Sequence, residues 1–126
     1  MKEAFLVFAG GGAGSVLRWL VGKSALYSPA ASLPWHTFAV NIAGSFLLGI
    51  LLGFFVLQPS EENHNWRLLF GGGFCGGFTT FSTFAYENVQ LLQNNQLPAF
   101  FLYTFGCLVA GLLAVAAGIY LAKVFV

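Results

Sequence analysis

The sequence predicts an all-α integral membrane protein with four transmembrane helices, of which the third is broken. The first observation is composition: 58% of the 126 residues are hydrophobic, only 7% are charged, and the mean hydropathy is +0.81. Such values are typical of membrane proteins rather than soluble domains. The second observation is the presence of four long apolar stretches, and the third is a glycine-rich segment within one of them. We therefore expect residues 1–126 to form a single transmembrane domain.

Each apolar stretch is long enough to span a membrane, because about 20 apolar residues cross roughly 30 Å of hydrocarbon. The predicted spans are approximately residues 4–22, 37–57, 67–92 and 98–122. Polar, proline-containing connectors separate them, as expected at helix boundaries. The first run exceeds the apolar part of a signal peptide and lacks a cleavage pattern after it. It is expected to be a span, with Met1 starting the mature chain.

The basic residues give almost no orientation bias under the positive-inside rule. Four spans place them on two sides: Lys2, Arg67 and Lys123 against Arg18 and Lys23. This near balance fits a weak signal in a small protein. It fits equally a chain that inserts in both orientations and pairs with its inverted copy.

The two cysteines, Cys75 and Cys107, lie within predicted spans and do not form a C-x-x-C pair. A membrane thiol–disulfide enzyme would be expected to carry a paired, accessible motif. Buried free cysteines behave as small apolar residues, which is the interpretation we favour here. The sequence also contains no phosphate-binding loop, and no enzymatic activity is expected.

The third predicted span contains the segment GGGFCGGFTTFSTF at residues 71–84, which is poorly suited to a lipid-facing helix. Each glycine inside a helix costs about 1 kcal/mol relative to alanine, and this segment has five glycines followed by four hydroxyl residues. Irregular backbone at membrane depth persists only where it is buried in protein or lines a hydrated path. Tight packing of a glycine-rich helix on a neighbour is the alternative. Residue types alone do not decide between a functional break and tight helix packing.

A break near Gly76 or Gly77 would leave carbonyl oxygens free close to the bilayer midplane. Such oxygens suit a hard cation. A structural cation there would also offset the negative charge of an anion passing nearby.

The helical half after the break carries features that favour an anion. Phe81 and Phe84 are three residues apart and share a face, and a neighbouring polar stripe consists of Thr79, Ser82 and Thr83. Aromatic ring edges are electropositive, hydroxyls donate hydrogen bonds, and a new helix presents free N–H groups.

Three further polar residues lie within the apolar runs. Asn41 needs a partner in the protein or water, and its NH2 group can join two helices or donate to an anion. Arg18 and Glu87 are functional candidates because they are ionisable, although either could pair structurally or reach the interface.

Three motifs, in order along spans one to three, carry a family resemblance. They are GGAG at residues 11–14 leading to Arg18 and Trp19, Thr37 to Asn41 followed by Gly44, and GFCGGFTTFSTF at residues 73–84. Together they resemble the CrcB/Fluc fluoride channel family, and the third is highly specific. The resemblance implies an antiparallel, dual-topology homodimer with two fluoride pores in a bacterial inner membrane.

The resemblance also implies roles for particular residues. A central sodium ion would be held by the backbone carbonyls of Gly76 and Thr79 from each subunit. The fluoride pore would be lined by Asn41, Phe81, Ser82, Thr83 and Phe84, with Arg18 in the vestibule. Span four departs from relatives, because Gly111 and Val115 stand where hydroxyls are common. Tyr103 and Thr104 are candidate substitutes.

The implied function is passive, fluoride-selective export that lowers the cytoplasmic fluoride concentration. The alternative is a small four-span proton-coupled multidrug-type exporter, which would need a titratable carboxylate deep in the membrane. Glu3 lies at the edge of its span and Glu87 late in its span, so the sequence does not favour it. A non-transporting scaffold would leave Asn41 and the phenylalanine and hydroxyl stripes without a role.

Overall fold

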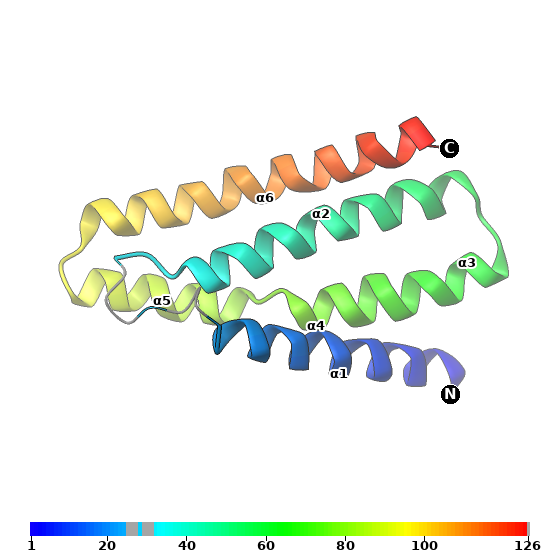
Figure 1. Cartoon of the computed structure of the whole chain (residues 1–126), viewed down its shortest axis with the longest axis horizontal. Coiled ribbons are helices and arrows are strands. Elements are labelled where there is room, and N and C mark those ends of the chain that lie inside the picture. The colour runs from blue at the N-terminus through cyan, green and yellow to red at the C-terminus, as the bar shows by residue number, and fades with distance from the viewer. Residues whose placement is uncertain (25–27, 29–31, 126) are drawn as a thin grey trace.

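The computed structural model describes residues 1–24, 28 and 32–125, which form helices and no strands. Four helical runs lie side by side and alternate in direction (Figure 1). The first, second and last are α1 (Lys2–Gly22), α2 (Trp35–Leu57) and α6 (Leu97–Phe125). The third consists of α3 (Glu61–Trp66), the π-helix η1 (Arg67–Cys75), α4 (Gly76–Phe78) and α5 (Phe81–Gln93). The predicted all-α class is confirmed.

Three helices of the described chain are long and apolar enough to cross a membrane. They cover Lys2–Gly22, Trp35–Phe55 and Leu97–Phe125, with mean hydropathies of 1.5, 2.1 and 2.2. Each is at least 21 residues long, and at about 1.5 Å per residue this matches a hydrocarbon core of roughly 30 Å. The third run is divided into shorter helices, so its path across the membrane remains a prediction.

The third run leaves helical conformation at Thr79 and Thr80, whose φ and ψ are −83° and 158°, and −148° and 123°. The helix expected to end near Gly76 or Gly77 continues to Phe78. Preceding it, η1 is wound as a π-helix over nine residues, whereas π geometry usually occurs as a single turn at functional sites. The glycines do not mark the end of the helix, and two of them, Gly73 and Gly77, pack against α1 instead.

Helix α1 packs directly against the backbone of η1 and α4. A Cβ atom on Gly14 would clash with the carbonyl oxygen of Phe74, and one on Gly77 would clash with that of Gly11. Close backbone approach through small residues is how membrane helices associate. The packing interpretation therefore accounts for Gly77 in the glycine-rich segment. It does not account for Gly72 and Gly76, where an added Cβ would meet nothing within 4 Å.

Helices α2 and α6 form the other close pair, visible as the two upper ribbons of Figure 1. Here Cβ atoms on Gly49 and Gly118 would clash with the carbonyl oxygens of Val115 and Phe46. Small residues therefore bring α2 and α6 close together, as they do for α1 and the third run.

Replacing Gly14 by alanine is expected to destabilise the protein by about 1–3 kcal/mol, because the added methyl group meets backbone atoms of η1 and α4. The matched control is Gly12→Ala in the same helix, where the new Cβ has open space. Thermal unfolding in detergent should show a lower midpoint for Gly14→Ala and an unchanged or higher one for Gly12→Ala. Equal midpoints would contradict the packing shown here.

Candidate functional site

Asn41 of α2 holds the broken backbone of the third run. Its Oδ1 accepts a hydrogen bond from the N–H of Thr80 at 2.8 Å, and its Nδ2 donates to the carbonyl oxygen of Thr80 at 3.1 Å. Backbone groups freed by a break need partners at membrane depth, because lipid supplies none. One side chain therefore satisfies both backbone groups of Thr80. The Asn41 NH2 group carries a second N–H, and neither of these two bonds uses it.

The two threonines of the break cap the helices on either side. The hydroxyl of Thr79 donates to the carbonyl oxygen of Cys75 at 2.8 Å, and the Thr80 hydroxyl accepts from the N–H of Thr83 at 3.2 Å. The second contact is a standard N-cap, so α5 begins where the sequence supplies a capping residue. Within the described residues, the carbonyl oxygens of Gly76 and Thr79 accept no hydrogen bond.

A cavity of about 390 Å³ opens beside the break, and we call it the break pocket. Its walls come from α2, the third run and α6. Five of the predicted site residues line it together: Asn41, Gly76, Thr79, Phe81 and Phe84. Ser45 of α2 and Gly111 of α6 also line this pocket. Gly111 has no hydroxyl to offer there, and Ser45 supplies one from the facing helix.

The two phenylalanines of α5 lie side by side at the break pocket. Their ring centroids are 5.9 Å apart with an interplanar angle of 45°. Phe84 also packs on Tyr103 of α6, at 5.2 Å and 49°. Phe81 is 78% exposed in the single chain, so the described part of the chain leaves most of this side chain uncovered.

A second cavity of about 260 Å³ lies on the other side of the break and contains Arg18; we call it the arginine pocket. Its remaining lining residues are Ser15, Trp19, His36, Thr37, Val40, Thr80 and Thr83. Thr80 lines both pockets, and its hydroxyl lies 3.2 Å from that of Thr83 and 3.4 Å from that of Ser82. Hydroxyl groups thus lie between the arginine pocket and the break pocket.

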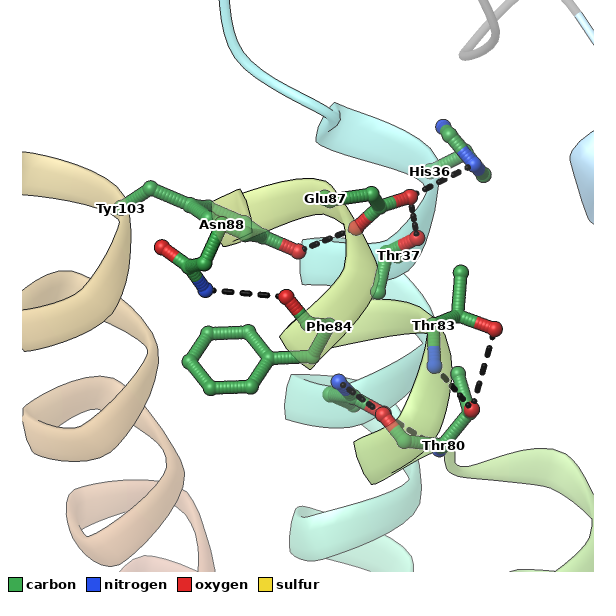
Figure 2. Close-up of polar contacts among 9 residues, drawn as sticks. His36, Thr37, Thr80, Thr83, Phe84, Glu87, Asn88 and Tyr103 are labelled. Atoms are coloured by element: carbon green, nitrogen blue, oxygen red, sulfur yellow. Dashed lines mark hydrogen bonds and ion pairs between the residues drawn. The ribbon is translucent and has the colours of Figure 1, made fainter. Parts of the chain in front are cut away.

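Glu87 lies above these hydroxyls in a cluster of donors, which Figure 2 shows. Its carboxylate accepts hydrogen bonds of 2.7 Å from the hydroxyls of Thr37 and Tyr103, and His36 Nε2 lies 3.4 Å from Oε1. The Glu87 side chain is only 11% exposed. Of the two structural roles open to Glu87, pairing within the protein is the one observed.

Comparison with known proteins identifies the family. The chain matches the family model for CrcB-like protein, Camphor Resistance (CrcB), over residues 5–119. The chain belongs to the CrcB family. A CrcB relative from Phocaeicola vulgatus, named fluoride-specific ion channel FluC, is 45% identical over 124 residues, covering 98% of this chain and 100% of the relative.

Two further CrcB relatives carry the same name. The protein from Gloeothece citriformis is 44% identical, covering 98% of each chain, and that from a Caulobacter species is 37% identical, covering 98% of this chain and 96% of its own. CrcB membership, together with the three apolar helices, makes this chain a multi-pass membrane protein.

In this CrcB chain the predicted site residues separate into two groups. The break pocket gathers five of them, while Arg18 and Thr83 line the arginine pocket. Ser82 lines neither pocket and is exposed, although its hydroxyl is close to that of Thr80. Val115 lies at the contact with Gly49.

Four residues at the CrcB site were missed as site candidates by the sequence analysis. They are His36, Thr37, Ser45 and Thr80. Thr80 had a usable signal, because a threonine three residues before Thr83 at a predicted helix start matches an N-cap. No signal in the sequence indicates the contact of Thr37 with Glu87, since the two residues are 50 positions apart.

Proposed function

We propose that this protein is a fluoride-selective ion channel that passively exports fluoride and lowers its cytoplasmic concentration. The observation that carries the proposal is the break pocket, where the Phe81 and Phe84 rings and the Asn41 carboxamide meet. The relatives named fluoride-specific ion channels support the choice of ion. Fluoride is strongly hydrated, so a pore must replace its water with donors and positive ring edges without binding it too tightly.

The proposed path joins the two pockets. Fluoride enters beside Arg18, is passed along the hydroxyls of Thr83, Thr80 and Ser82, and reaches the edges of the phenylalanine rings. No charged side chain of the described residues lines the break pocket, so the pocket does not hold the ion by an ion pair. An inside-negative membrane potential assists export by about 2.3 kcal/mol per charge per 100 mV. The process is non-enzymatic, and the bacterial relatives support a location in a bacterial inner membrane.

We further propose that two copies of the chain pair in opposite orientations to form the working channel, each as a four-span unit. The free carbonyl oxygens of Gly76 and Thr79 support this, because lipid could not satisfy them. The uncovered surface at Gly72, Gly76 and Phe81 supports it as well. A second copy over this face would bring four carbonyl oxygens together, a ligand set that suits a sodium ion.

The decisive experiment measures ion release from liposomes that contain the purified protein. Fluoride-selective and chloride-selective electrodes should record fluoride efflux that far exceeds chloride efflux, because the proposed path is lined by hydroxyls and ring edges. Equal rates for the two ions, or no flux, would refute the proposal. Adding a proton gradient distinguishes the exporter alternative, since a coupled exporter could move its substrate uphill and a channel could not.

A further inference from the structure

The second residue of α2, His36, lies in the wall between two cavities. It lines the arginine pocket on one side. On the other it lines a polar cavity of about 280 Å³, the outer pocket, whose other residues include Ser32, Glu87, Gln90 and Asn94. The side chain is 21% exposed. An anion moving from the outer pocket to Arg18 would therefore pass this imidazole.

The charged groups around His36 come from several elements. Glu87 of α5 is the nearest, with 3.4 Å between the imidazole Nε2 and the carboxylate. The hydroxyls of Thr37 and Tyr103 each donate a hydrogen bond of 2.7 Å to that carboxylate. Arg18 of α1 shares the arginine pocket with His36. Lys23, directly after α1, places its Nζ 3.9 Å from the ring centroid of Trp19, which also lines that pocket.

Among these groups, histidine is the type whose charge ordinarily changes between about pH 5 and 8. When the imidazole is neutral, the negative charge of Glu87 in the wall of the outer pocket is not offset by His36 and opposes the entry of an anion. When it is protonated, it forms an ion pair with Glu87 and offsets that charge. The positive charge of Arg18 then dominates the field in the arginine pocket.

We propose that His36 controls, through its charge, how readily fluoride enters the arginine pocket, so that conduction increases as pH falls. This inference rests on the proposed channel function. The sign follows from the chemistry of histidine as a residue type, because an imidazole gains a proton, and with it one positive charge, as pH falls. Fluoride flux is therefore high near pH 5.5 and low near pH 8.

The test measures fluoride efflux from liposomes held at the same pH on both faces, at pH 5.5, 6.5 and 8. Rates from protein-free liposomes are subtracted at each pH, because undissociated HF crosses lipid. We expect wild-type flux to rise at least about threefold from pH 8 to pH 5.5, a smaller change than the roughly 10- to 1,000-fold that a whole charged cleft adds to entry rates. His36→Gln should give a flat profile, and His36→Arg a flat profile above that of His36→Gln. The control is His64→Gln, which removes the other histidine of the chain. His64 lies beside Glu3 at the opposite end of the bundle, so this variant should keep the wild-type profile.

The possible outcomes are distinguishable. Fluoride flux that does not depend on pH in the wild type, or an equal dependence in His36→Gln, overturns the role of His36 and leaves the channel function intact. No fluoride flux at any pH overturns the channel function itself. Should His36→Gln fail to purify as a folded protein, His36→Asn and His36→Arg decide the question, since neither changes its charge in this pH range.

Discussion

Replacing Asn41 by leucine is expected to abolish fluoride flux and to destabilise the protein. Leucine has the same branching at Cγ as asparagine but leaves the N–H and carbonyl oxygen of Thr80 without their partners. Each buried polar group left unpaired costs about 1–3 kcal/mol. The backbone at the break should shift, and with it the positions of Thr80 and Phe81. Flux from liposomes and thermal unfolding in detergent measure the two effects.

The matched control is Asn88→Leu, which makes the same chemical change in α5. Asn88 is 7% exposed, donates to the carbonyl oxygen of Phe84 and accepts from the hydroxyl of Thr104. It lies on the helix and does not contact the break. Both variants should unfold at lower temperature, while only Asn41→Leu loses flux beyond what the fraction of folded protein explains. Comparable losses of flux in the two variants would show that the two hydrogen bonds between Asn41 and Thr80 have no special role in conduction.

Replacing Phe81 by leucine is expected to reduce fluoride flux about tenfold or more while leaving the fold of the single chain intact. Tenfold corresponds to about 1.4 kcal/mol, similar to the contribution of one aromatic contact. Leucine is apolar like phenylalanine but offers no electropositive ring edge. Because the ring is 78% exposed in the single chain, its removal takes little away from the packing of that chain.

Phe8→Leu provides the control for this prediction. Phe8 lies on α1, away from both pockets, and is also 78% exposed. Its replacement removes the same ring from a surface that has no proposed role, so flux should stay at the wild-type rate. If Phe81→Leu conducts fluoride as fast as Phe8→Leu, the ring edges of Phe81 do not stabilise the ion.

Much of the fold could be predicted because membrane spans are long and compositionally uniform. The helices α1, α2 and α6 cover the predicted ranges 4–22, 37–57 and 98–122. The end of the helix before the break was placed too early, because glycine lowers helix propensity and also permits close packing. Only the position of α1 against Gly77 distinguishes these two effects.

The site was predictable where its residues are neighbours in sequence and unpredictable where they are brought together by packing. Phe81 and Phe84 share a face because of helical periodicity, which a sequence shows directly. The clamp between Asn41 and Thr80 spans 39 positions, and the contact between Tyr103 and Glu87 joins two helices. Periodicity could not indicate these partners. Nor could it show that Glu87 would find enough donors to be buried.

The even number of helical runs places the beginning of α1 and the end of α6 at the same end of the bundle, as Figure 1 shows. This constrains how such a protein could evolve by gene duplication. If two copies pair in opposite orientations, the end of α6 in one copy and the beginning of α1 in the other lie on opposite sides of the membrane. A flexible polar linker could not connect them. A tandem gene fusion that preserved the pairing would have to acquire an additional membrane-crossing segment between its halves.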